Sequence, residues 1–162
     1  PQPACSNKTF YLVGHSQRPD DPSLRCVYTC YEGTNDKWVN RTLWFETLDQ
    51  EPGSTDPEEF GILFQVKCRG LTLIQVNVTG FLERYTQAKR FYQLLDYDGD
   101  FMVLGDKLPR LSKSAHCSLW ATTTSKNFTQ LPQNITETLH SQCENMTTYP
   151  YPQNCSTPLQ YQ

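Results

Sequence analysis

The sequence predicts an all-β domain: an eight-stranded, antiparallel, up-and-down barrel followed by one α-helix near the C-terminus. Short segments in which apolar and polar side chains alternate are typical of strands, and turn-forming residues separate these segments. There are eight of them, about the number that closes a small barrel around one ligand. A chain of 162 residues also suits one domain with a single core. We therefore expect one domain over residues 1–162, with the barrel at about 9–124, the helix at about 131–144 and a tail at 145–162.

The predicted strands follow one another along the chain up to the end of the barrel. They cover residues 9–14, 25–32, 39–47, 58–69, 71–81, 89–97, 101–104 and 115–123. Between the sixth and the seventh strand, the pair Asp98-Gly99 is typical of a two-residue type I′ hairpin turn.

The helix is predicted from the residues that follow the last strand. Pro132 suits the first turn of a helix. Ile135, Leu139 and Cys143 recur at four-residue spacing and form one apolar stripe that faces the barrel. From Tyr149 onward the chain is rich in proline, which predicts a coil around the outside.

The asparagines and cysteines indicate that the chain is exported. Ser and Thr make up 28 of 162 residues, so chance alone would place about 1.4 of the eight asparagines in N-x-S/T sequons. Seven of them lie in such sequons, which are expected glycosylation sites: Asn7, Asn40, Asn77, Asn127, Asn134, Asn145 and Asn154. Seven cysteines point to the same oxidising compartment, and the odd count predicts one unpaired thiol or a covalent dimer. The start at Pro1, without a signal peptide, suits a mature end left by processing.

Composition and motifs argue against several classes of function. A net charge of −3 and a pI of about 5.6 give no basic footprint for nucleic acid, and no apolar run approaches a bilayer-spanning length. No catalytic signature frames the serines and histidines, and His116 beside Cys117 lacks a CxxC or HxxxH partner for zinc. Asp96, Asp98 and Asp100 alternate like calcium ligands but suit a solvated hairpin tip, since no Glu takes the twelfth position. We expect neither an enzyme nor a cofactor or metal site.

The sequons also predict which side chains face the barrel lumen. A glycan cannot point into a core and side chains alternate along a strand, so outward Asn40 places Trp44 outward and Arg41 inward. The same reasoning from Asn77, and the apolar alternation of residues 58–69, give the candidate ligand-binding set: Arg41, Leu43, Phe45, Phe60, Ile62, Phe64, Val66, Ile74, Val76 and, from the sixth strand, Phe91. The inward aromatics suit either a packed core or the wall of a pocket.

Arg41 has two interpretations. At the barrel rim its stem would lie along the apolar wall while its guanidinium reaches water. Within the lumen it would meet a ligand carboxylate bidentately, as a fatty acid or an eicosanoid would allow and a sterol would not.

Six short motifs resemble those of the tick histamine-binding lipocalins, in order and spacing, from about residue 9 to 155. They are YLV at 11–13, CV at 26–27, VNRTLWF at 39–45, FYQLLDYD at 91–98, DFMVL at 100–104 and CSLW at 117–120. The resemblance implies a lipocalin barrel with a disulfide-stapled tail. It further implies two disulfides, Cys26 with Cys155 and Cys117 with Cys143; the apolar stripe that contains Cys143 supports the second. The partners of Cys5, Cys30 and Cys68 stay open.

One departure from that family bears on the ligand. Amine-binding members carry a Cys-Asp pair before the seventh strand and Glu-Leu-Trp on the eighth, whereas this chain has Gly99-Asp100 and Ser118-Leu119-Trp120. Members without these carboxylates include carriers of fatty acids, leukotrienes and sterols and the Japanin-like group that modulates host immune cells, to which residues 11–16 are most similar.

Three functions follow as hypotheses for a secreted salivary protein. The first is a scavenger that holds a small hydrophobic host ligand, such as a sterol, fatty acid or eicosanoid, and so modulates host immunity or inflammation. The second is a protein-binding immunomodulator that engages a host receptor or plasma protein through Trp44 or the segments 49–56 and 106–114. The third, which the missing carboxylates disfavour, is a histamine or serotonin scavenger. Either a monomer or a dimer through the unpaired cysteine is expected.

Overall fold

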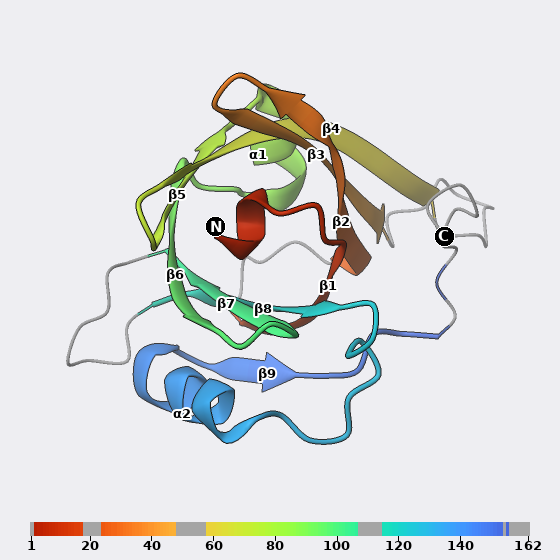
Figure 1. Ribbon diagram of the computed structural model, residues 1–162. Helices are drawn as coiled ribbons and strands as arrows, with labels where there is room; N and C mark the ends of the chain where they lie inside the picture. Colours follow the sequence, from red (N-terminus) through yellow and green to blue (C-terminus); the bar gives the residue numbers. More distant parts are fainter. Residues whose placement is uncertain (1, 18–23, 48–57, 107–114, 154, 156–162) are drawn as a thin grey trace.

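Eight antiparallel strands close into a barrel, as Figure 1 shows for the computed structural model of the protein. The structure describes residues 2–17, 24–47, 58–106, 115–153 and 155. The sheet order is β2-β3-β4-β5-β6-β7-β8-β1, and β1 pairs back with β2. This confirms the up-and-down barrel. The strands are β1 (Phe10–Ser16), β2 (Leu24–Asn35), β3 (Trp38–Thr47), β4 (Glu58–Arg69), β5 (Leu73–Asn77), β6 (Phe91–Tyr97), β7 (Phe101–Gly105) and β8 (Cys117–Thr122).

The barrel closes at a seam where β1 changes its partner. Its first two residues pair with β2, whereas its last three pair with β9 (Met146–Thr148), a strand in the segment expected to be tail. Gly14 permits this contact, because a Cβ there would lie 2.9 Å from the carbonyl oxygen of Thr147. The tail is therefore partly hydrogen-bonded into the sheet.

The strand predicted at 71–81 is wrong in its second half. β5 ends at Asn77, and a short helix, α1 (Gly80–Thr86), follows. Thr79 begins this helix as its N-cap, since its hydroxyl accepts a hydrogen bond of 3.2 Å from the Leu82 N–H. The apolar residues after Asn77 thus serve a helix that covers one end of the barrel rather than a longer strand.

The turn between β6 and β7 also differs from its prediction. Tyr97 pairs with Met102, and the Asp98 N–H donates to the Phe101 carbonyl, so the two central residues are Gly99 and Asp100. Only the first of them has a positive φ, whereas a type I′ turn needs a positive φ at both, so the turn is not type I′. The Asp98 carboxylate accepts from two backbone N–H groups of the turn.

Two clusters of apolar side chains lie on opposite sides of the barrel wall. One fills part of the lumen, and the other lies outside, where α2 (Gln133–Gln142) and the tail pack on the barrel. Ile135 and Leu139 of the predicted stripe are buried in the outer cluster, and Pro132 is the N-cap of the helix. On β8 the alternation is plain: Leu119 faces α2 and Trp120 faces the lumen.

Three disulfides join the described residues. The structure contains both pairs that the family resemblance implied, Cys26–Cys155 and Cys117–Cys143. A third bond joins Cys5 to Cys68. The remaining thiol, Cys30, is only 4% exposed on the outer side of β2, which does not favour an intermolecular disulfide.

The N-terminal segment lies across one end of the barrel. In Figure 1 its single turn of 3-10 helix, η1 (Pro3–Cys5), lies inside the ring of strands. Cys5 is bonded to Cys68 near the end of β4, and the Gln2 amide donates to the carbonyl oxygens of Gly70 and Leu73 in the β4–β5 turn, both at 3.0 Å. No element is predicted for this segment from its sequence.

Trp44 is not the exposed anchor that a partner surface would need. Its ring lies flat over Gly61, where a Cβ would come within 2.7 Å of it, and it stacks on Tyr28 with ring centroids 6.4 Å apart. It belongs to the outer cluster that the tail covers. Of the segments 49–56 and 106–114, proposed for the same surface, only Asp106 lies among the described residues.

The outer surface carries the sequons. Asn40 of β3 and Asn77 of β5 lie on either side of Gln65 of β4, and each hydrogen-bonds the Gln65 side chain. The other four described sequon asparagines are exposed, and Asn154 lies outside the described residues.

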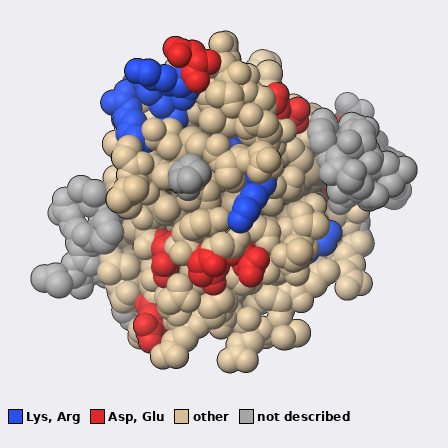
Figure 2. All heavy atoms as spheres, viewed as in Figure 1, with Lys and Arg blue, Asp and Glu red and all other residues tan. Residues whose placement is uncertain are grey.

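Figure 2 shows the end covered by η1: Lys and Arg atoms gather at the upper left and Asp and Glu atoms lie mainly lower down. No helix among the described residues is long and apolar enough to cross a membrane.

Candidate ligand-binding cavity

The lumen holds a cavity of about 290 Å³, close to the lower end of the range for small-molecule sites. It lies between the N-terminal segment at one end and α1 at the other. Each of the eight barrel strands contributes side chains to its lining, and most of them are apolar. The middle of the wall includes Leu12, Leu43, Val66, Ile74, Met102 and Trp120.

The end of the cavity nearest the N-terminus is built around Arg41. This residue is 2% exposed, lines the cavity beside Ala4 and Phe10, and reaches back to the N-terminal segment. Its guanidinium donates to the carbonyl oxygens of Ser6 (2.9 Å) and Lys8 (2.6 Å). It also donates to Thr29, at the hydroxyl (3.1 Å) and the carbonyl (3.2 Å).

Both earlier interpretations of Arg41 are therefore wrong in part. The residue is not at a solvated rim, and four of its five N–H groups already have protein acceptors, so a bidentate bond to a ligand carboxylate is not free to form. No carboxylate lies within ion-pair distance of it in the described part of the chain. Burial accordingly lowers the pKa of Arg41 to about 10, although the nearby Cys30 and Glu32 raise it. The charge remains, and it serves to hold the N-terminal segment.

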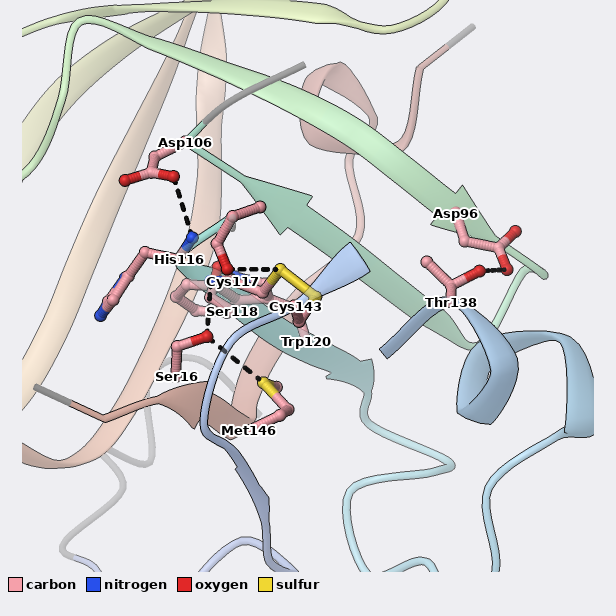
Figure 3. The surroundings of a disulfide bond; sticks show 11 residues. Ser16, Asp96, Asp106, His116, Cys117, Ser118, Trp120, Thr138, Cys143 and Met146 are labelled. Atoms are coloured by element: carbon pink, nitrogen blue, oxygen red, sulfur yellow. Dashed lines mark hydrogen bonds between the residues drawn. A yellow bond between two sulfur atoms is a disulfide. The ribbon is translucent and has the colours of Figure 1, made fainter. Parts of the chain in front are cut away.

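The end of the cavity nearest α1 is more polar. His15, Lys89, Asp106, His116 and Ser118 line it, together with Thr86 and Gln87 at the end of α1. Figure 3 shows how the ends of β7 and β8 are joined there: the Asp106 carboxylate accepts from the His116 N–H at 2.9 Å. The Asp106 N–H in turn donates to the His116 carbonyl.

Hydrogen bonds and a disulfide connect this end of the cavity to β9 and α2 on the outside of the barrel. In Figure 3 the Ser16 hydroxyl lies between β8 and β9, accepting from the Cys117 N–H at 2.9 Å and approaching the Met146 sulfur at 3.9 Å. Cys117 also forms a disulfide with Cys143 at the end of α2. Asp96 of β6 holds α2 from the other side by accepting from the Thr138 hydroxyl at 2.9 Å.

The structure brings together six of the ten residues expected to contact ligand. Phe45 and Phe60 form instead a stacked aromatic group with Tyr85 of α1, with ring centroids 5.7–6.0 Å apart. Ile62 packs in the lumen cluster without lining the cavity, and Phe91 is 47% exposed outside, because Tyr92 takes the inward position. The six that line the cavity are Arg41, Leu43, Phe64, Val66, Ile74 and Val76.

Sequence reasoning missed the lining residues of the strands without sequons. Leu12, Tyr92, Met102 and Trp120 all line the cavity. The period-two alternation of β1, β6, β7 and β8 contains this information, but it needs a known outward residue to fix which half of the alternation faces inward. The Trp120 indole N–H donates a hydrogen bond of 2.8 Å to the Ser118 hydroxyl.

Comparison with known proteins shows where the chain belongs. No protein-family model matches it. It is 32% identical over 155 residues to Japanin from Rhipicephalus appendiculatus, and the alignment covers 94% of this chain and 83% of the relative. The chain belongs to the Japanin family of tick salivary lipocalins.

Solved structures agree with this assignment. Japanin in its cholesterol-bound crystal structure matches with a TM-score of 0.78 at 30% identity, covering 94% of this chain and 98% of that one. The serotonin complex of AM182 matches at 15% identity with a TM-score of 0.57, covering 92% and 85% of the two chains, which shows the shared fold alone. The Japanin-family fold is that of ligand-binding lipocalins rather than of enzymes.

Proposed function

We propose that this chain is a secreted carrier that holds one neutral, hydrophobic small molecule of the sterol class in its barrel and withholds it from host tissue. The observation that carries the proposal is the apolar cavity closed at one end by the N-terminal segment. Burial of apolar ligand surface contributes about 25 cal/mol per Å², so a sterol needs few polar contacts to bind in such a wall. The Japanin structure with cholesterol supports the same ligand class.

The polar groups of the cavity favour a neutral ligand over a charged one. A protonated amine would lie in a lumen whose buried cation, Arg41, has no carboxylate partner among the described residues. Ser118 of β8 lines the cavity and bonds Trp120, so it supplies no negative charge. The one carboxylate in the described lining, Asp106, already accepts from the His116 N–H and shares its end of the cavity with the cation Lys89, so the two charges there offset each other. A fatty acid would find at most one free N–H on Arg41. A sterol hydroxyl has only a modest desolvation cost, which the polar groups at the α1 end can offset.

The first experiment identifies the ligand. Protein purified from eukaryotic secretion is extracted with organic solvent, and the extract is analysed by mass spectrometry, followed by titration with dehydroergosterol, palmitate and histamine. We expect sterol in the extract, sterol binding in the micromolar range or tighter, and histamine binding only at millimolar levels. An extract of carboxylic acids without sterol would shift the assignment to fatty acids or eicosanoids.

A matched pair of variants tests whether the cavity is the site. Val66→Trp fills the lumen, since Val66 is 3% exposed and lines the cavity, whereas Leu63→Trp places the same indole ring on the outer face of the same strand, where Leu63 is 63% exposed. Sterol binding should be lost in the first variant and kept in the second. Applied to host immune cells, the pair also tests the alternative of a protein-binding immunomodulator: an effect that survives in Val66→Trp would come from the outer surface.

A further inference from the structure

We infer that α1 and the residues that follow it form a docking surface for lipid bilayers, through which the barrel exchanges its ligand. The inference rests on the proposed function, because a hydrophobic ligand must be taken from, or given to, a lipid surface. The surface is made of Phe81, Arg84, Lys89, Arg90 and Phe91. We call it the α1 surface.

The α1 surface lies next to the cavity. Leu82 and Thr86 on the inner side of α1 line the lumen, as do Gln87, Ala88 and Lys89 directly after it. Leu82 is 2% exposed, whereas Phe81, the neighbouring residue on the outer side, is 66% exposed. The same seven-residue helix therefore contacts the ligand cavity on one side and solvent, through a large aromatic ring, on the other.

Charge distinguishes this surface from an ordinary apolar patch. Arg84 lies three residues from Phe81, and therefore beside it on the helix, and Lys89 and Arg90 are exposed immediately before the half-exposed ring of Phe91. Residues 81–91 hold three basic side chains and one acidic one, a net charge of +2 in a chain whose net charge is −3. Aromatic rings flanked by Lys and Arg are the combination that binds a bilayer interface, with apolar insertion and attraction to lipid phosphates.

The opposite end of the barrel cannot serve the same exchange. There the Cys5–Cys68 disulfide and the hydrogen bonds of Gln2 and Arg41 fix the N-terminal segment across the lumen. An exposed apolar residue is present at that end too: Leu71 in the β4–β5 turn is 87% exposed. Leu71 has no cavity residue beside it in the chain, which makes it the matched control for Phe81.

The test measures how sterol leaves the barrel. Protein loaded with dehydroergosterol is mixed with phosphatidylcholine vesicles, with and without phosphatidylserine, and the transfer rate is followed by fluorescence as the vesicle concentration rises. Docking predicts a rate that rises with vesicle concentration, rises further with phosphatidylserine and falls with salt. Phe81→Ala and the double variant Arg84→Gln/Arg90→Gln should each slow transfer at least about threefold with unchanged equilibrium sterol affinity. Leu71→Ala should transfer like the parent protein.

Two results would overturn the docking surface. One is a transfer rate that is independent of vesicle concentration, since the ligand would then leave through water. The other is an equal slowing by Leu71→Ala and Phe81→Ala. None of these substitutions touches a sequon, so glycosylation is matched. If the protein binds no sterol, the proposed function fails, and co-flotation of the ligand-free protein and its variants with the same vesicles still decides the docking surface: loss of flotation in Phe81→Ala and in the double arginine variant, but not in Leu71→Ala, supports it, and equal flotation of all forms contradicts it.

Discussion

The two ends of the barrel are held closed in different ways. At one end the N-terminal segment is bonded covalently through Cys5–Cys68 and is further held by hydrogen bonds from Gln2 and Arg41. At the other end α1 is held by its Thr79 cap and by the stack of Tyr85 on two phenylalanines. The first closure is covalent, whereas among the described residues the second is held by side-chain packing, with Leu82 of α1 buried in the lumen cluster beside the aromatic group. Opening for a ligand is therefore expected at α1.

The largest effect should come from removing the disulfide of the fixed end. Cys5→Ser with Cys68→Ser opens a loop of 63 residues, which costs about 4 kcal/mol in the chain-entropy model. At about 2–4 °C per kcal/mol for a chain of this size, the melting temperature should fall by roughly 8–16 °C. Calorimetry measures the loss. Cys30→Ala is the control, since it removes a buried thiol but no disulfide; an equal loss there would mean that the disulfide contributes nothing specific.

The next largest effect is expected for Arg41→Ala. The substitution removes four hydrogen bonds and leaves the carbonyl oxygens of Ser6 and Lys8 without a donor, which should cost about 3 kcal/mol. Arg84→Ala, an exposed arginine at the α1 end, should change the free energy of unfolding by no more than about 0.5 kcal/mol. Urea titration of the two variants makes the comparison. Equal stability of both would show that Arg41 does not hold the N-terminal segment.

The same variant separates the ligand classes. Because the guanidinium is engaged by the protein, Arg41→Ala should change palmitate and sterol affinities by similar factors. A selective loss of palmitate binding by tenfold, about 1.4 kcal/mol, would restore the interpretation of Arg41 as a carboxylate partner.

The two ends also differ in how well the sequence predicts them. Alternation and turn residues were enough for the number and order of the eight strands, although not for the end of β5, and the sequon at Asn40 correctly placed Arg41 and Leu43 in the lumen. The N-terminal segment has no periodicity, because its structure comes from a disulfide and from Arg41, which lies 33 to 35 residues further along the chain than the carbonyl groups that it binds. A seven-residue helix such as α1 gives too few turns for a clear period. Since Phe45 and Phe60 pack under that helix, their separation from the cavity could not be predicted either.

A smaller effect is expected at the α1 end. Thr79→Ala removes the cap of α1 and also the sequon of Asn77, so its reference is Asn77→Gln, which removes the sequon alone. Relative to that reference, the loss of the cap should cost about 1 kcal/mol, or roughly 2–4 °C. Its signature is local: hydrogen exchange should become faster in residues 80–86 and stay unchanged in η1 and β4. An increase in exchange that spreads equally to both ends would show that the two closures open as one cooperative unit and not independently.

The smallest effect concerns a carboxylate where β4 begins, on the α1 side. Burial raises the pKa of Glu59 above its ordinary value of 4.5, and the charge of Glu46, its partner on β3, raises it further, while a hydrogen bond from the Tyr28 hydroxyl at 3.5 Å lowers it. The folded protein therefore binds this proton more tightly than the unfolded chain does. Its favourable contribution is present below the unfolded pKa and is lost as the pH rises through the folded pKa.

Glu59→Gln should accordingly raise the melting temperature at pH 7 and leave it nearly unchanged at pH 3.5, where the parent carboxyl is also neutral. The amide keeps an oxygen that can accept from Tyr28, so the comparison isolates the charge. Melting curves between pH 3.5 and 8 measure the difference, and Glu58→Gln, at the exposed neighbouring position, is the control that should show no such divergence. A Glu59→Gln curve parallel to that of the parent protein at every pH would mean that the burial of this carboxylate has no cost. The pH dependence of stability would then have to originate at a group other than Glu59.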